Sequence, residues 1–162
     1  MLQLKNVDTA RIVCLFQSRA SGHRQISIFF PILLRMKART MIFIGSLFMA
    51  LAVGFGAFGA HIVQDMLTTE RFQVYQTAAE YHFYHAIGIL IIGILSMLIE
   101  QSPWLKWAGY LLVAGILIFC GSLYILALTD TAWLGAITPI GGVAFILGWT
   151  FAAVGITTGR LE

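Results

Sequence analysis

The side chains in this sequence that could do chemistry gather in a few short stretches. His61 ends residues 54–61 (GFGAFGAH), and residues 81–85 (YHFYH) begin twenty positions later. Glu80 directly precedes the second stretch, and Tyr124 lies much further along the chain. The candidate polar cluster therefore consists of His61, Glu80, Tyr81, His82, His85 and Tyr124.

This set of residue types allows three kinds of reactive site. Two or three imidazoles together with Glu80 could bind a transition metal such as zinc or copper, and His61, His82 and His85 would be the histidine ligands. Paired histidines near a membrane surface could hold haem. Histidines with tyrosines could relay protons or form hydrogen bonds with a quinone head group. His82 and His85 are one helical turn apart, so we expect them to share a face that His61 approaches from a neighbouring helix.

The same residue types also suit a membrane interface without any reaction. Tyrosine and histidine each present an apolar ring and a polar atom, which fits the head-group zone of a bilayer. The spacing favours this interpretation over the reactive ones. No cofactor is predicted, whether any metal binds is left open, and the chain contains no phosphate loop, nucleophile elbow or HExxH motif that would indicate an enzyme.

The elements that must position these residues follow from composition. Of the 162 residues, 59% are hydrophobic and 10% charged, and the mean hydropathy is +0.88. A soluble domain has roughly 25% charged residues. Lipid must therefore be the solvent for most of the chain. The two cysteines, Cys14 and Cys120, provide no disulfide framework.

Four apolar runs are each long enough to cross a bilayer, for which about 20 residues suffice. They occupy about residues 42–61, 81–99, 107–128 and 137–156. Their short connections predict an all-α, four-transmembrane-helix antiparallel bundle, up-down-up-down. Residues 62–80 are more polar, and we expect a short interfacial helix there, capped by Thr69. The spans carry no Asp, Glu, Lys or Arg, which argues against an ion-coupled transporter.

Small residues favour close helix packing in lipid, where no hydrophobic effect drives helices together. Two stripes repeat at four-residue spacing in the first and last spans: Ala52, Gly56 and Ala60, and Ala144, Gly148 and Ala152. Residues 54–61 accordingly read as the close-packing end of the first span. A cleavable signal peptide is the alternative for this first apolar run.

Residues 1–35 differ from the remainder. They carry five basic residues and one acid, a balance of +4, whereas residues 36–162 balance to −1, together giving the chain's +3. The basic character belongs to this stretch and does not indicate nucleic-acid binding. Met36 begins MKART directly before the first span, so we interpret 1–35 as an extension outside the natural fold and 36–162 as one transmembrane domain. An amphipathic arm on anionic lipid is the alternative.

The distribution of basic residues predicts the orientation, because short cytoplasmic loops are enriched in Lys and Arg. One side of the four-span arrangement has only Arg71. The other side has Lys37, Arg39, Lys106 and Arg160. Both termini are therefore expected in the cytoplasm, with the protein in the inner or plasma membrane.

Four motifs in order resemble the YgdD/YwdK-type family of small integral membrane proteins of unknown function. They are GAFGAH at 56–61, YHFYHA at 81–86, CGSLYILALT at 120–129 and ITPIGGVAFILGW at 137–149. The resemblance covers residues 36–158. It implies a multi-pass membrane protein, transfers no catalytic residues, and implies a start near Met36.

The functional hypotheses follow from both lines of reasoning. The first is a non-enzymatic structural, assembly or interaction protein, with the lipid bilayer as its surroundings and a second copy or other membrane proteins as candidate partners. The second is a metal-, haem- or proton-handling site at the non-cytoplasmic end. The third, a small-solute channel or transporter, is disfavoured because the spans provide hardly any polar path.

Overall fold

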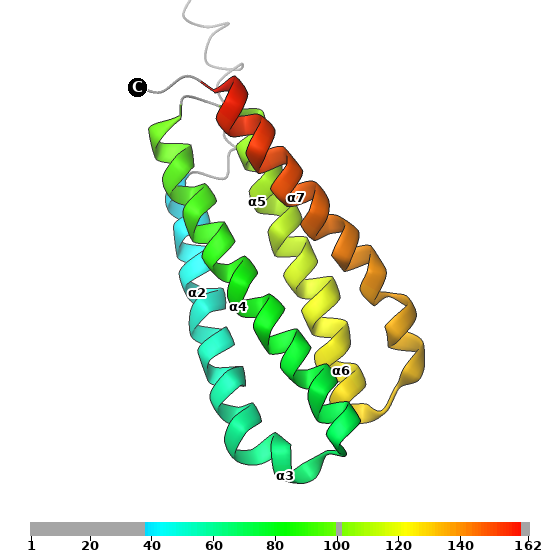
Figure 1. Ribbon diagram of the computed structural model, residues 1–162. Coiled ribbons are helices and arrows are strands. Elements are labelled where there is room, and N and C mark those ends of the chain that lie inside the picture. The colour runs from blue at the N-terminus through cyan, green and yellow to red at the C-terminus, as the bar shows by residue number, and fades with distance from the viewer. Residues whose placement is uncertain (1–37, 100–101, 160–162) are drawn as a thin grey trace, which may run out of the picture. The chain divides into compact units, whose positions relative to one another are not determined.

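The computed structural model describes residues 38–99 and 102–159, and four membrane-spanning helical segments occupy them (Figure 1). The interpretation of residues 1–35 lies outside the described residues. The bounds, in chain order, are α2 (Ala38–Phe58), the π-helix η1 (Gly59–Val63) and α3 (Gln64–Met66), α4 (Thr69–Leu98), α5 (Pro103–Gly115), the π-helix η2 (Ile116–Cys120) and α6 (Gly121–Thr129), and the 3₁₀-helix η3 (Ala132–Ala136) and α7 (Thr138–Thr158).

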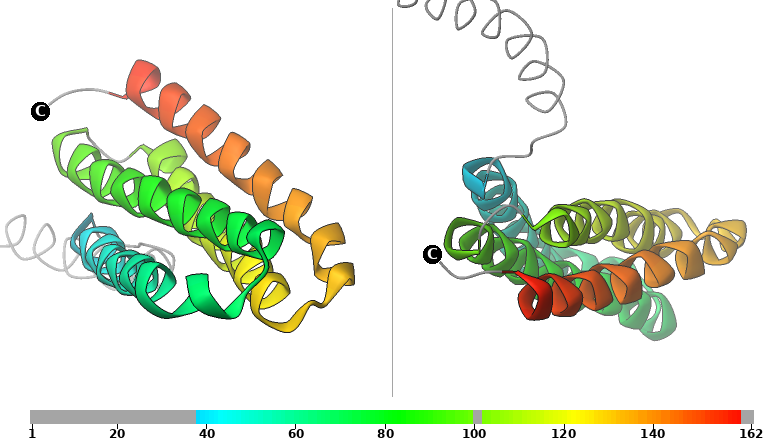
Figure 2. Two further views of the ribbon diagram at one scale, coloured as in Figure 1. Left: turned by 60° about the horizontal axis from the view of Figure 1, so that its bottom comes forward. Right: turned by 90° about the horizontal axis from the view of Figure 1, so that it is seen from above.

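The helices pack mainly against their neighbours in the chain. α2 lies along α4, α4 lies along the α5–η2–α6 segment, and α7 lies along α5 and η2 (Figures 1 and 2). Each chain reversal joins antiparallel neighbours. The predicted helical membrane bundle is confirmed. The long apolar side chains left exposed, such as Phe43 and Ile146, are those a lipid environment solvates.

The second span differs from the prediction at its start. α4 is one helix from Thr69 to Leu98, so residues 69–80 extend the span and do not form a separate interfacial helix. The reason is that no glycine or proline interrupts the sequence before Gly88. The cap also falls one residue earlier, because the hydroxyl of Thr68 accepts a hydrogen bond of 3.4 Å from the backbone N–H of Arg71.

Two connections are set by local chemistry. Pro103 occupies the first turn of α5, where its missing N–H is not needed. Asp130 ends α6 with φ of 59°, in the left-handed region that aspartate tolerates better than most residues. Its N–H closes the helix on the carbonyl of Leu126.

Small residues bring the helices together at specific points. A Cβ on Gly45 would lie 2.9 Å from Leu90, and one on Gly148 would lie 2.7 Å from Leu112, so α2 approaches α4 and α7 approaches α5 at glycines. Of the stripe predicted in α7, Gly148 and Ala152 are buried and Ala144 is half-buried.

The stripe predicted in the first span lies differently. Ala52 is buried, but Gly56 and Ala60 are exposed, and nothing lies within 4 Å of a Cβ built on Gly56. The buried small residues are Gly45, Ala52 and Gly59, which repeat every seven positions. Two helical turns, and not one, therefore separate the positions that face α4.

Candidate functional site

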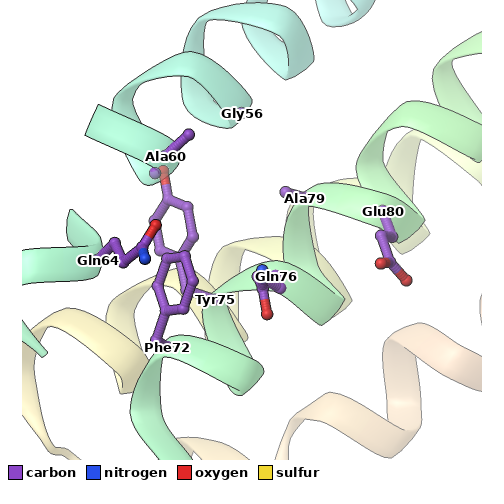
Figure 3. Close-up of a pocket in the computed structure, with 9 residues that line it drawn as sticks. Gly56, Ala60, Gln64, Phe72, Tyr75, Gln76, Ala79 and Glu80 are labelled. Atoms are coloured by element: carbon purple, nitrogen blue, oxygen red, sulfur yellow. The ribbon is translucent and has the colours of Figure 1, made fainter. Parts of the chain in front are cut away.

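A groove of about 260 Å³ lies where the first span ends and α4 begins (Figure 3). We call this end of the bundle, formed by α3, the start of α4 and the end of α6, the α3 end. Gly56, Gly59 and Ala60 line one side of the groove, and Phe72 and Tyr75 line the other. Its polar lining residues are Gln64, Gln76 and Glu80.

Tyr75 fixes the shape of this groove. Its hydroxyl donates a 2.7 Å hydrogen bond to the backbone carbonyl of Phe55, which ties α4 to α2. The ring is 2% exposed and stacks beside Phe72 at 6.5 Å between ring centroids. A Cβ on Gly59 would lie 2.5 Å from Cε1 of Tyr75, so only glycine permits this contact. Gly59 begins the π-helix η1, and π-turns of this kind are frequent at functional sites.

Behind Tyr75 lies a buried aromatic cluster that contains His82. The Tyr75 and Tyr124 ring centroids are 5.0 Å apart, and those of Tyr124 and His82 are 6.2 Å apart. Phe55 lies 4.8 Å from Tyr124 and 6.0 Å from His82, and Phe48 lies 5.7 Å from His82. Three helices, α2, α4 and α6, thus enclose one imidazole and one phenol.

Two side chains of this cluster, His82 and Tyr124, have polar atoms without partners. Both ring nitrogens of His82 and the hydroxyl of Tyr124 are buried without a hydrogen bond. The backbone carbonyl of Phe48 is near the His82 ring, but the geometry of a hydrogen bond is not met. Buried polar atoms are nearly always paired, so two such groups in contact mark this place as unusual.

His85 belongs to a different environment from His82. Its ring stacks on Phe145 of α7 at 3.5 Å, and its Nδ1 lies 2.7 Å from the backbone carbonyl of Tyr81. Residues three apart differ by about 300° around a helix, which is 60° short of a full turn. Because α4 has neighbours on both sides, this offset directs His82 toward α2 and α6 and His85 toward α7.

The remaining predicted site residues lie at the surface. His61 is exposed within η1, and Glu80 is exposed and lines the groove. Tyr81 is 40% exposed, and its ring stacks on Phe119 at 4.7 Å. Within 38–99 and 102–159, no three His, Cys, Asp or Glu side chains come together as a set that could hold a metal ion. The structure therefore joins His82 with Tyr124, and Glu80 with the groove, but does not bring the three histidines to one point.

Two further polar contacts hold the α3 end together. The Nε of Arg71 donates a 2.8 Å hydrogen bond to the carbonyl of Ala127, near the end of α6. The hydroxyls of Ser122 and Thr138 are 2.9 Å apart and link α6 to α7. These bonds join three of the four spans where the candidate site lies.

Comparison with known proteins bears on this region directly. A family model described as "Protein of unknown function (DUF423)" matches residues 55–142, which include the groove, His82 and Tyr124. The chain belongs to this DUF423 family. No solved structure matches it.

Relatives of this DUF423 chain are named as membrane proteins. It is 49% identical over 111 residues to a UPF0382 membrane protein of Staphylococcus epidermidis, covering 68% of this chain and 89% of the relative. It is 43% identical over 116 residues to the UPF0382 membrane protein YwdK of Bacillus subtilis, covering 72% of this chain and 94% of YwdK. The resemblance to a YwdK-type family is confirmed, and this chain is a multi-pass membrane protein.

Several residues that line the groove were not identified as site residues from the sequence. Tyr75, Gln64 and Gln76 line the groove but are not among the candidate site residues of the sequence analysis. The signal was nevertheless present, since Tyr75, Ala78 and His82 follow helical spacing on one face of α4. No sequence pattern indicated that this face of α4 packs against Phe55 and Gly59 of the first span.

Proposed function

We propose that this protein is a non-catalytic membrane protein of the cell membrane that binds a phospholipid head group bearing a primary ammonium ion, of the phosphatidylethanolamine type. The groove at the α3 end carries the proposal. It has an apolar wall of glycines, alanines and aromatic rings beside one carboxylate and two side-chain amides. The sequence led us to expect an interaction protein, and the proposed partner is this lipid head group.

The depth of the groove in the bilayer supports this proposal. α4 has 30 residues, a length of about 45 Å, whereas the hydrocarbon core is about 30 Å thick. If Leu98 lies at one boundary of the core, about 20 residues bring the other boundary near Ala79. The part of α4 that lines the groove, from Phe72 to Glu80, then lies at the level of the head groups.

Charge favours an ammonium ion over an anionic head group. Glu80 is the one charged residue among the groove's described lining residues. The α3 end as a whole has a single cation, Arg71, and four acids, Asp65, Glu70, Glu80 and Asp130. An ammonium group supplies N–H donors to a carboxylate, a charge-assisted hydrogen bond.

The amides complete the recognition. Gln64 reaches toward the Tyr75 and Phe72 rings from the first span, while Gln76 and Glu80 follow one another along α4 (Figure 3). Each amide both donates and accepts hydrogen bonds, so Gln64 and Gln76 suit the phosphate and ester oxygens next to an ammonium group. The Tyr75 hydroxyl, already bonded to Phe55, shapes the wall without contacting the head group.

The orientation is part of the same proposal. Both termini lie in the cytoplasm, and the groove opens on the non-cytoplasmic side, which the positions of Lys37, Arg39, Lys106 and Arg160 support. Reporter fusions after Asp130 and at Glu162 should report opposite sides, the second one cytoplasmic. Reporters on the same side would contradict the four-span arrangement, and an exchange of sides would contradict the orientation alone.

The binding test uses the purified protein in micelles, titrated separately with phosphatidylethanolamine, phosphatidylcholine and phosphatidylglycerol. We expect the ethanolamine lipid to raise the unfolding temperature most. Glu80→Gln should weaken its apparent affinity by about fivefold to tenfold, because the amide oxygen still accepts a hydrogen bond and only the charge assistance, about 1 kcal/mol, is lost. Glu70→Gln is the matched control, since Glu70 lies on the same helix outside the groove's lining residues. Equal effects of all three lipids, or unchanged affinity in Glu80→Gln, would reject the proposal.

A further inference from the structure

His82 and Tyr124 form a second polar site, separate from the groove, in the buried aromatic cluster between α2, α4 and α6. His82 is 3% exposed and Tyr124 is 9% exposed. Neither ring nitrogen of His82 nor the hydroxyl of Tyr124 has a hydrogen-bond partner. Two helices thus each contribute one unpaired polar group to the same cluster.

The chemistry of the two side chains is complementary to a single oxygen atom. A neutral imidazole has one N–H donor and one nitrogen acceptor, and a phenol both donates and accepts. The rings meet at an angle of 66° with centroids 6.2 Å apart, an arrangement that places no direct bond between them. An oxygen within about 3 Å of both groups would satisfy one polar atom of each.

The aromatic surroundings of His82 and Tyr124 favour a neutral guest over a charged one. Phe48, Phe55 and Tyr75 line the cluster with aromatic carbon, and the only polar group of these three side chains, the Tyr75 hydroxyl, is bonded to Phe55. A charged guest would find no counter-ion among these aromatic side chains, and burying it unpaired would be costly.

We infer that His82 and Tyr124 together bind one neutral, hydrogen-bonding oxygen atom within the membrane-spanning part of the protein. A buried water molecule and the carbonyl of a lipid-soluble molecule share this chemistry. The two sources differ in protons, since water also donates to Tyr124 or to the free imidazole nitrogen, whereas a carbonyl only accepts.

The test is solid-state NMR of the full chain with ¹⁵N-labelled histidine in phosphatidylcholine bilayers, with His82 assigned from its absence in His82→Phe. We expect a hydrogen-bonded His82 N–H. A cross-peak to water identifies water as the source, and a co-extracted carbonyl compound detected by mass spectrometry, without that cross-peak, identifies a lipid-soluble guest. A His82 ring with no hydrogen bond on either nitrogen, or with its N–H bonded only to the backbone carbonyl of Phe48, would overturn the inference.

A variant tests the contribution of the phenol. Tyr124→Phe keeps the ring and removes only the hydroxyl, so the His82 N–H should shift and exchange with solvent about tenfold faster, the loss expected for one hydrogen bond. Tyr81→Phe is the matched control, because Tyr81 stacks on His85 and should leave His82 unchanged. An unaltered His82 signal in Tyr124→Phe would show that no guest is shared. If that variant does not fold, the His82 signal of the unmodified protein decides alone.

Discussion

The contact between Gly59 and Tyr75 gives the sharpest test of how the first two spans pack. An added Cβ at Gly59 would lie 2.5 Å from the Tyr75 ring. That ring cannot easily withdraw, because its hydroxyl is bonded to Phe55 and the ring packs edge-to-face with Tyr124. Gly59→Ala should therefore force α2 and α4 apart.

The chain provides its own control three residues earlier. Gly56 has nothing within 4 Å of an added Cβ, so Gly56→Ala should only gain helix propensity, about 1 kcal/mol. Gly59→Ala gains a similar amount but adds an overpacking cost of about 1–3 kcal/mol. The free energies of unfolding of the two variants should thus differ by about 1–3 kcal/mol, with Gly59→Ala the less stable.

Reversible unfolding in mixed micelles measures this difference, with helix content followed by circular dichroism. Both variants should retain the native helix content in the absence of denaturant. Equal stability of the two variants, or a larger loss in Gly56→Ala, would refute the packing of the first span described above.

Two other hydrogen bonds yield comparable predictions. Tyr75→Phe should lower the free energy of unfolding by about 1–2 kcal/mol, because the part-buried hydrogen bond to the carbonyl of Phe55 is lost. Tyr84→Phe, at an exposed position on the same helix, should change this free energy by less than about 0.5 kcal/mol. Equal effects of the two substitutions would contradict this reasoning. Ser122→Ala should lower the free energy of unfolding by only about 0.5–1 kcal/mol in the same assay, since Thr138 keeps its hydrogen bond to the backbone carbonyl of Leu134. A loss above about 2 kcal/mol would contradict this expectation.

The spans could be predicted from sequence because apolar length is a strong and local signal. Pro103 at the start of α5 is an equally local signal, since its effect is confined to its own turn. The continuity of α4 through residues 69–80 was missed because polarity was read as a break in structure. Helix formation depends on backbone hydrogen bonds, and polar residues do not interrupt them.

The site was harder to predict from the sequence, because it depends on the direction in which each residue points from its helix. His82 and His85 share a turn, yet an offset of about 60° sends them to different neighbours. Gly56 and Gly59 look alike in sequence, and only the position of Tyr75 distinguishes them. Partners of this kind come from elements far apart in the chain, so spacing within one helix does not identify them.

Competition between lipids in one bilayer tests the proposed function most directly. The protein is reconstituted in nanodiscs with equal amounts of phosphatidylethanolamine and phosphatidylglycerol, and the lipids that remain bound are counted by native mass spectrometry. The account predicts retention of the ethanolamine lipid, lost in Glu80→Gln and kept in Glu70→Gln. Retention of the glycerol lipid, or equal retention of both, would contradict it.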